Sequence, residues 1–345
     1  MDASKKTHNE QDKQKKVVLT GITPSGIAHL GNYIGAIKPA LEMAKNDAYN
    51  AYFFIADYHS LIKLWDPKLR QEYIYDIAAT WLALGLDPTK VVFYRQSDIP
   101  EIAELNWILT SVTAKGLLNR AHAYKAAVDQ NELEGKADLD SGINMGLFNY
   151  PVLMAADILM FNADLVPVGK DQIQHIEIAR DIANRFNHIY KTNTLTVPTA
   201  MIEEKTQTIL GLDGRKMSKS YGNTIPLFAP SKKLRKLIMK IVTNSQLPEE
   251  PKSTENCTIF SLYEHFATPS EINALKERYQ NGIGWGEAKQ ILFEKIDSVL
   301  TPFREKYDDL MANRHIIDEH LKAGQQKARL EAQKVLSAVR KKAGI

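Results

Sequence analysis

The sequence predicts an α/β protein in which a doubly wound parallel sheet forms the main body and a smaller α-helical domain follows it. Up to about residue 230, short apolar runs alternate with amphipathic stretches of helical period, joined by short turns. Beyond that point strand signals almost vanish and helical patterns continue to the C-terminus. The 345 residues also exceed the length over which one hydrophobic core usually keeps growing, which favours two domains.

The first elements follow one another regularly. The segment KKVVLTGITPSG, residues 15–26, begins as a β-branched strand and ends in a Gly/Pro/Ser turn, and the amphipathic residues 30–45 predict a helix. Strands that alternate with helices in this way form parallel sheets. The same pattern recurs twice, with strands expected at 51–57 and 90–98 and helices expected at 66–86 and 99–118.

The acidic, polar segment 128–142, VDQNELEGKADLDSG, is predicted to be a loop inserted into this body. After it, a helix at 150–161, a strand at 164–169 and a helix at 170–186 continue the α/β pattern. We therefore expect the catalytic domain to span residues 16–229.

The two ends of the chain differ from this body. Residues 1–15 are polar, without periodic apolar positions, and predict a disordered leader. Residues 230–345 form the expected helical domain, whose amphipathic patterns lie at 231–243, 269–280, 285–307 and 316–341.

Composition excludes several classes of protein. With 44% hydrophobic and 25% charged residues, the chain is neither collagen-like, mucin-like nor wholly disordered. The net charge of +3 is too small to indicate a nucleic-acid partner by itself. The single cysteine, Cys257, excludes an internal disulfide framework and a Cys-rich zinc site. Without a long apolar run or a signal-peptide core, we expect no membrane segment and a cytoplasmic protein.

A segment with the sequence TGITPSGIAHLGN, residues 20–32, lies where the first strand meets the first helix. Ligands of open α/β sheets bind at such carboxyl ends, and a helix N-terminus favours phosphate. The segment matches neither the P-loop nor the GxGxxG fingerprint. Gly26 and Gly31 allow a ligand to approach the backbone, and His29 and Asn32 lie one helical turn apart. Taken alone, a capped turn with a surface histidine is the simpler interpretation.

A second segment, KMSKS at residues 216–220, lies in the flexible setting GLDGRKMSKSYGNT. Lys216 and Lys219, with two serine hydroxyls between and beside them, can surround a polyphosphate and neutralise its charge as it leaves. Arg215 adds a third cation. A five-residue match of this kind is usually only an exposed basic loop. The two segments together, in one α/β body, are much more specific than either alone.

The sequences HLGN at 29–32, preceded by PSG, and KMSKS resemble the two signature sequences of class I aminoacyl-tRNA synthetases, which activate an amino acid with ATP on a Rossmann fold. Within that class, YPVLMAADIL at 150–159 and DLVPVGKDQIQH at 164–175 resemble the amino-acid and ribose segments of the tryptophanyl-tRNA synthetase family. The similarity runs from about Val17 to the C-terminal helices. It implies a Rossmann-like catalytic domain and an anticodon-binding helical domain.

The resemblance implies a tryptophan pocket whose acceptor for the indole N–H is Asp157. An indole carries one polar N–H on an apolar double ring, so a selective pocket needs one buried acceptor in an apolar wall. Asp157 stands among Met154, Ala155, Ala156 and Ile158, which disfavours the alternative of a carboxylate on a helix surface. By the same resemblance, Tyr150 and Gln172 would bind the α-ammonium, Met154 would pack on the ring and His59 would lie nearby.

The resemblance also implies the ATP site, in which Lys216, Lys219, His29 and Asn32 would be the catalytic residues. The remaining contacts would come from the signature loop, the ribose segment, an adenine contact and the KMSKS loop: Thr23, Pro24, Ser25, Gly31 and Asn32; Gly169, Lys170 and Asp171; Ile209; and Lys216, Met217, Ser218, Lys219 and Ser220.

The chain departs from the family pattern at three positions. Thr23 stands where many relatives carry Gln, and Leu19 where many carry Phe, so the phosphate contact and the floor of the indole pocket differ from theirs. Lys170 replaces a frequent Glu. A further phosphate-binding lysine of the family has only one candidate here, Lys125, because the segment 128–142 obscures the alignment.

The implied reaction is attack of the tryptophan carboxylate on the α-phosphorus of ATP, loss of pyrophosphate, and transfer of tryptophan to the terminal ribose of tRNA(Trp). No residue cluster in the sequence suggests a protein metal site, and Mg²⁺ is expected to bind through the ATP phosphates. The partners implied are L-tryptophan, tRNA(Trp) and a second copy of the chain. Three alternatives remain: a tyrosyl-tRNA synthetase, a small-molecule nucleotidyltransferase, and a non-catalytic RNA-binding paralogue.

Overall fold

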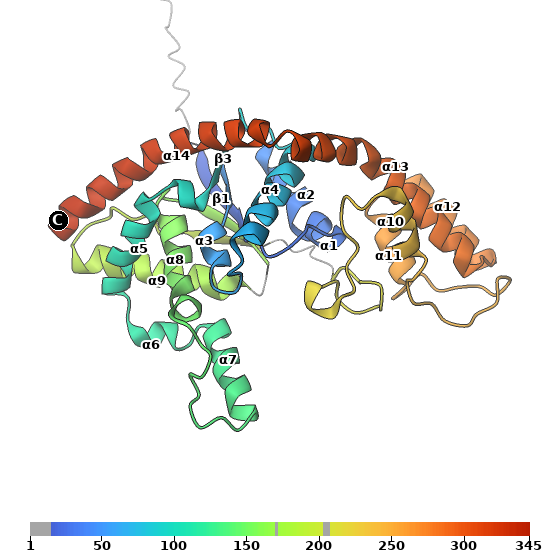
Figure 1. The fold of residues 1–345 in the computed structure, drawn as a ribbon, viewed down its shortest axis with the longest axis horizontal. Helices are drawn as coiled ribbons and strands as arrows, with labels where there is room; N and C mark the ends of the chain where they lie inside the picture. Colours follow the sequence, from blue (N-terminus) through green and yellow to red (C-terminus); the bar gives the residue numbers. More distant parts are fainter. Residues whose placement is uncertain (1–14, 170–171, 203–207) are drawn as a thin grey trace, which may run out of the picture.

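The computed structural model describes residues 15–169, 172–202 and 208–345, and Figure 1 shows its fold. Within these residues, a sheet of five parallel strands has the order β3-β2-β1-β4-β5. The strand order reverses direction at β1, so the topological switch point lies between β1 and β4, where open α/β sheets bind ligands. The strands are β1 (Lys16–Ile22), β2 (Tyr49–Ile55), β3 (Val92–Arg95), β4 (Leu165–Val168) and β5 (Thr199–Ile202).

Helices connect the strands and cover both faces of the sheet (Figure 1). In the first half of the chain they are α1 (Leu30–Asn32), α2 (Lys38–Ala44), α3 (Asp57–Ser60), α4 (Pro67–Ala83), α5 (Glu101–Val112), α6 (Lys115–Leu118), α7 (His122–Leu133), α8 (Met145–Leu159) and α9 (Ile173–Ile189). The C-terminal part contains α10 (Ser231–Ile238), α11 (Thr258–Glu264), α12 (Pro269–Asn281), α13 (Trp285–Ala312) and α14 (Arg314–Ala343). The predicted α/β fold class is confirmed.

The alternation of β2 explains why both faces of the sheet are covered. Phe54 enters a core shared with α5, α8 and α9, whereas Phe53 and Ile55 enter a second core with α2 and α4. Successive strand residues point to opposite faces, so an uninterrupted apolar strand needs packing on both sides. The apolar run AYFFI therefore accounts for the central position of β2.

Some local predictions need correction. The acidic segment 128–142, expected to be a loop, is helical up to Leu133, where α7 ends. In Figure 1, α6 and α7 project away from the sheet, so the polar sequence of α7 can form a helix without packing an apolar face against the sheet. The helix expected over 30–45 is interrupted by a π-helical segment, Tyr33–Ile37, and the strand β5 and the helix α11 were not recognised from the sequence.

The C-terminal helices serve two different cores. Helices α10 to α13 form a third core, with Leu234, Leu275 and Leu292 inside it. Helix α14 instead crosses the edge strand β3, where a Cβ on Gly324 would lie only 1.7 Å from the Phe93 carbonyl oxygen. This close approach requires glycine. The domain division at residue 230 stays a prediction, and α14 is packed on the α/β body.

Across residues 15–169, 172–202 and 208–345, no helix combines the length and the apolar character that crossing a bilayer requires.

Candidate active site

A cavity of about 210 Å³ opens at the carboxyl ends of β1 and β4. All five residues predicted to bind tryptophan line it: Tyr150, Met154 and Asp157 from α8, His59 from α3, and Gln172 just before α9. Leu19, Phe54, Ile158 and Val166 supply apolar wall. The structure thus brings together residues that lie more than a hundred positions apart in the sequence, as the resemblance implied. Their binding roles stay predictions.

Asp157 is completely buried and accepts hydrogen bonds from two side chains. His59 Nε2 lies 2.9 Å from Oδ2, and Gln96 Nε2 lies 2.7 Å from Oδ1 and 2.9 Å from Oδ2. Burial raises the pKa of the Asp157 carboxyl, and the hydrogen bonds from His59 and Gln96 oppose that rise. The result is a buried acceptor in an apolar wall, the chemistry that an indole N–H needs.

The other end of the cavity is polar. The Tyr150 hydroxyl lies 3.0 Å from His175 Nε2, and burial raises the pKa of Tyr150. His175 is buried on α9 and also lines the cavity. Sequence reasoning did not single out His175, although it is the last residue of DLVPVGKDQIQH, which resembles the family's ribose segment.

The signature segment forms a tight turn at the N-terminus of α1. His29 and Asn32 cap this helix reciprocally: the Asn32 N–H donates to His29 Nδ1 at 3.3 Å, and the His29 N–H donates to Asn32 Oδ1 at 3.2 Å. Burial, assisted by the nearby Lys219 charge, lowers the pKa of His29 to about 4. The ring is therefore neutral near pH 7, and because Nδ1 accepts, Nε2 carries the proton.

The KMSKS loop lies directly against the signature segment. The Gly31 N–H points to the Met217 sulfur at 3.3 Å, and the Leu30 N–H donates to the Ile225 carbonyl at 2.9 Å. Ile209 is buried, and its carbonyl accepts the Met217 N–H at 2.7 Å. The two signature sequences and the predicted adenine contact thus pack together, with Leu30, Met217 and Ile209 in one hydrophobic core.

Lys219 approaches the signature turn at Gly26. Gly26 has φ = +137°, a backbone conformation that favours glycine, and a Cβ there would lie 3.0 Å from Lys219 Nζ, so the lysine end would have to shift slightly to make room. Partial burial lowers the pKa of Lys219, and Asp76 opposes that fall. In the same loop, Lys216 and Ser220 are exposed and Ser218 is half-buried. Arg215 forms an ion pair with Asp213.

Thr23 connects the two halves of the site. A second cavity of about 100 Å³ lies between the signature segment, α4 and Lys219, and its lining includes Ser25, Asn32 and Thr23. Thr23 also lines the larger cavity. The predicted amino-acid and phosphate sites therefore meet at this residue, while the neighbouring Pro24 is buried.

The ribose segment is described only in part. Gly169 follows β4, and its carbonyl accepts the Gln172 N–H at 2.9 Å. Lys170 and Asp171 lie outside the described residues, so their predicted contacts stay predictions. Lys125, the candidate for the further phosphate contact, lies on α7.

Asp76 is a buried site residue that sequence reasoning missed. Its Oδ2 accepts the Ala28 N–H of the signature segment at 3.1 Å, and its Oδ1 accepts the Tyr307 hydroxyl of α13 at 2.7 Å. Burial raises the pKa of Asp76. In the sequence, an aspartate among the apolar positions of α4 was the signal that could have indicated a buried polar contact. Asp76 links the signature segment to the C-terminal helices.

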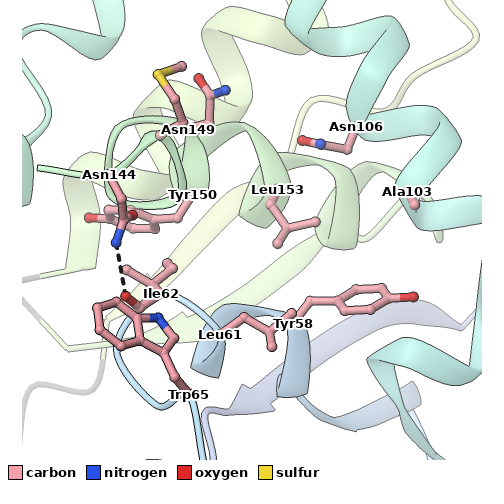
Figure 2. Close-up of a pocket in the computed structure, with 12 residues that line it drawn as sticks. Tyr58, Leu61, Ile62, Trp65, Ala103, Asn106, Asn144, Asn149, Tyr150 and Leu153 are labelled. Atoms are coloured by element: carbon pink, nitrogen blue, oxygen red, sulfur yellow. Dashed lines mark hydrogen bonds between the residues drawn. The ribbon is translucent and has the colours of Figure 1, made fainter.

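An apolar groove of about 620 Å³ lies beside the larger cavity (Figure 2). Leu61, Ile62 and Trp65 form one side of the groove, and Tyr150 and Leu153 of α8 form another. The Trp65 side chain is 75% exposed. Tyr150 lines both the groove and the cavity, so packing in the groove would act directly on the predicted amino-acid site.

Comparison with known proteins supports one family. Residues 11–301 match the model of the family described as tRNA synthetases class I (W and Y). The tryptophan--tRNA ligase of Neisseria meningitidis is 54% identical over 331 residues, covering 96% of this chain and 98% of the relative. That of Xanthomonas axonopodis is 58% identical over 307 residues, covering 89% and 71%.

Solved structures give the same result. The crystal structure of tryptophanyl-tRNA synthetase from Campylobacter jejuni, complexed with ADP and tryptophan, has a TM-score of 0.87 at 43% identity and covers 95% of this chain and 100% of its own. A tyrosyl-tRNA synthetase of Archaeoglobus fulgidus complexed with L-tyrosine shares the fold, with a TM-score of 0.63 at 19% identity over 86% of this chain and 91% of its own. The chain therefore belongs to the tryptophan--tRNA ligase family of class I aminoacyl-tRNA synthetases.

Proposed function

We propose that this chain activates L-tryptophan with ATP, forming tryptophanyl-adenylate and pyrophosphate, and then transfers tryptophan to tRNA(Trp). The observation that carries the proposal is the meeting of two cavities at Thr23, one containing Asp157 and the other bounded by Lys219. Amino acid and ATP bound there would place carboxylate and α-phosphorus close together, and such positioning supplies much of the rate of a displacement.

Recognition of tryptophan follows from the burial of Asp157. The carboxylate accepts the indole N–H, Met154 packs on the ring, and Tyr150 and Gln172 hold the α-ammonium, with His59 fixing the carboxylate. A site that pairs a buried acceptor with a substrate N–H rejects analogues without it by about 10⁴ or more. Phenylalanine would leave Asp157 without this partner.

Activation needs no covalent enzyme intermediate, because the substrate carboxylate is already a nucleophile at neutral pH. Lys216 and Lys219 neutralise the charge that develops on the departing pyrophosphate, and Ser218, Ser220 and Met217 shape the loop around it. Neutral His29 offers its Nε2–H to a phosphate oxygen, while Asn32 and Gly31 form the helix N-terminus beneath. Thr23, Pro24, Ser25 and the 169–171 segment complete the nucleotide contacts, with Ile209 against the adenine.

Mg²⁺ is proposed to bind through the phosphate oxygens of ATP. The charged side chains assigned to these phosphates, Lys216 and Lys219, are cations, so no carboxylate of the chain is assigned to the ion. When bound, the ion neutralises phosphate charge.

Binding of tRNA is assigned to the C-terminal helices, residues 230–345, as the anticodon-binding domain. Lys232, Lys233, Arg235 and Lys236 are exposed on α10, while Leu234 on the same helix is buried, so the cations face away from the third core. Such a surface is suited to phosphate contacts. We place the reaction in the cytoplasm, where tRNA is charged.

The charge-reversed variant Lys232→Glu/Lys233→Glu tests this assignment. It should lower the rate of tRNA aminoacylation severalfold and leave tryptophan-dependent exchange of pyrophosphate into ATP unchanged, because exchange needs no tRNA. Lys276→Glu on α12, also a charge reversal in the helical domain, serves as the control for a nonspecific effect of charge. Equal loss of exchange and aminoacylation would contradict a role for α10 in tRNA binding.

A homodimer is also proposed, with the second copy seated on the groove of Figure 2. Exposed Trp65, Leu61 and Met145 make this an apolar patch, which in soluble proteins marks an interaction surface. Sedimentation of the intact protein and of Trp65→Glu tests it: the variant should sediment as a monomer, and a wild-type monomer that charges tRNA at full rate would contradict it.

The tyrosyl alternative shares the fold. Pyrophosphate exchange into ATP, measured with each amino acid in turn, distinguishes a tryptophan-specific enzyme from a tyrosine-specific one. Tryptophan should support exchange far better than tyrosine or phenylalanine. Equal turnover with tyrosine would overturn the tryptophan assignment while leaving the class of enzyme intact.

A further inference from the structure

Gln96 is a completely buried amide behind the predicted tryptophan site. It opens the 3₁₀ turn Gln96–Asp98 at the carboxyl end of β3 and does not line the cavity itself. Its Nε2 donates to both oxygens of Asp157, at 2.7 and 2.9 Å. Its Oε1 accepts the Tyr58 N–H at 3.0 Å.

The Tyr58 contact fixes which way the amide faces. A backbone N–H can only donate, so the oxygen of Gln96 must face Tyr58 and the NH₂ group must face Asp157. The reversed amide would set two donors against each other at Tyr58 and two acceptors against each other at Asp157. The orientation of Gln96 is therefore set by the backbone of α3, independently of any substrate.

The adjacent Ser97 makes this arrangement rigid. Its N–H and hydroxyl both donate to the Asp57 carboxylate at the start of α3. The turn after β3 thus holds α3 at two points, through Gln96 to Tyr58 and through Ser97 to Asp57. Because α3 also carries His59, both side chains that donate to Asp157 are held by the same turn.

A carboxylate offers about four lone-pair positions. Gln96 occupies two of those on Asp157 and His59 occupies one, which leaves one acceptor position among the contacts of the described residues. A carboxylate free to rotate would have no preferred direction for that position. With these three contacts fixed in space by two donor nitrogens, the remaining position has a single direction relative to the cavity.

We propose that Gln96 is a positioning residue for substrate specificity, which fixes the Asp157 carboxylate so that its remaining acceptor position meets the indole N–H. The inference rests on the proposed function and assigns the role to a residue that does not touch the substrate. Both of its contacts serve the Asp157 carboxylate, one directly and one through α3, which carries His59, so its effect falls mainly on substrates that carry the N–H group.

Two substitutions test this on the full-length enzyme. Gln96→Met keeps the length but removes both the donor to Asp157 and the acceptor of the Tyr58 N–H. Gln96→Glu keeps the volume and an oxygen that can accept the Tyr58 N–H, but it replaces the NH₂ group by a second buried carboxyl that competes with Asp157 for a proton. Gln325→Met is the matched control, because Gln325 also donates to the turn after β3, at the Asp98 carbonyl, but does not reach Asp157.

Pyrophosphate exchange is measured with tryptophan and with β-(3-benzothienyl)alanine, in which sulfur replaces the indole N–H. In both Gln96 variants the KM for tryptophan should rise about tenfold or more, with kcat and the KM for ATP within about twofold. The preference for tryptophan over the sulfur analogue should fall by the same factor. Gln325→Met should change none of these quantities.

Three results would overturn the proposal. Equal losses with both substrates would make Gln96 a general structural residue, and an unchanged tryptophan KM would remove its role altogether. Loss of the folded state in both variants, seen by circular dichroism, would make Gln96 a determinant of folding rather than of recognition. Failure of the wild-type enzyme to use tryptophan would instead refute the proposed function, so the two failures are distinguishable.

Discussion

The amino-acid cavity and the KMSKS loop lie side by side but are built in opposite ways. In the cavity, Asp157 is completely buried, and each of its oxygens accepts a hydrogen bond from a side chain held elsewhere in the fold. In the loop, Lys216 is exposed and Lys219 is partly exposed, and within the part of the chain that the structure describes neither forms an ion pair with a carboxylate. Only the neighbouring Arg215 is paired, with Asp213.

The difference indicates how the two substrates are handled. The indole has one polar atom, which never changes its charge, so a rigid acceptor formed before binding is the better solution. Pyrophosphate gains charge as it leaves, so cations that are not paired with protein carboxylates can stabilise this developing charge. We therefore expect substitutions in the cavity to change tryptophan binding and substitutions in the loop to change the rate.

Lys219→Ala should have the largest effect and tests the second half of this comparison. Removing a charge that acts in the transition state costs about 10² to 10³ in rate. Single-turnover formation of tryptophanyl-adenylate should slow by that factor, while the dissociation constant of tryptophan stays within about twofold. The control is Lys45→Ala, which removes an exposed lysine that pairs with Glu42 far from the loop. An unchanged rate with weaker tryptophan binding would assign the loop to substrate binding.

Asp157→Ala tests the other half. Losing a hydrogen bond to a charged group in a buried site costs about 1.5–3 kcal/mol, or roughly 10- to 150-fold in affinity. The KM for tryptophan should rise by that amount, with the KM for ATP little changed. Asp164→Ala is a suitable control, because Asp164 also accepts a hydrogen bond inside the body, from the Val17 N–H, but lies outside the cavity lining. A tryptophan KM within twofold of wild type would show that Asp157 is not the acceptor.

Tyr307→Phe tests whether the loop region is coupled to the C-terminal helices. The change removes the hydroxyl that donates to Asp76 and keeps the ring that packs 4.7 Å from Phe228. Asp76 keeps its contact with the signature segment at Ala28 but loses the hydroxyl that holds it in place. We therefore expect a severalfold slower adenylate formation and about 1–2 kcal/mol less stability in urea unfolding.

Tyr75→Phe is the matched control for this coupling. The Tyr75 hydroxyl donates to Asp318 and thus also joins α4 to a C-terminal helix, but Asp318 does not contact the signature segment. Tyr75→Phe should lower stability without slowing adenylate formation. Equal kinetic effects of the two variants would show that Asp76 has no special role.

The two regions also differ in how far the sequence predicted them. Alternating apolar runs predicted the sheet and the helices around it, because their signals are local. The predicted tryptophan residues proved to line one cavity, since the resemblance supplied the spatial relation that spacing alone does not. Gln96, His175, Asp76 and Tyr307 were missed because each matters only through a partner far away in the sequence, such as Asp76 and Tyr307 on α4 and α13.

The C-terminal helices also show that local sequence patterns do not predict contacts between distant segments. Their amphipathic period predicted that they exist but not which core each one joins. Nothing in the residues around Gly324 indicates that the edge strand β3 lies against them, because that contact is set by the path of α13. Deleting all residues after 230 would therefore remove α14 from the α/β cores as well, so tRNA binding is better tested with point substitutions in the intact chain.

The smallest expected effect concerns the basic end of α14. Arg340 is already paired with Glu104 on α5, whereas Lys341 and Lys342 are exposed. Lys341→Ala/Lys342→Ala should therefore weaken tRNA binding about two- to fivefold at low salt, with the loss shrinking as salt rises, because each phosphate contact releases counterions. Tryptophan-dependent exchange should be unchanged, since this end of α14 lies far from the cavity lining. Binding is measured by filter retention of tRNA at several salt concentrations, beside Lys334→Ala, whose lysine pairs with Glu331 on the same helix. A loss that does not depend on salt would show that the two lysines act through the packing of α14 rather than through phosphate contacts.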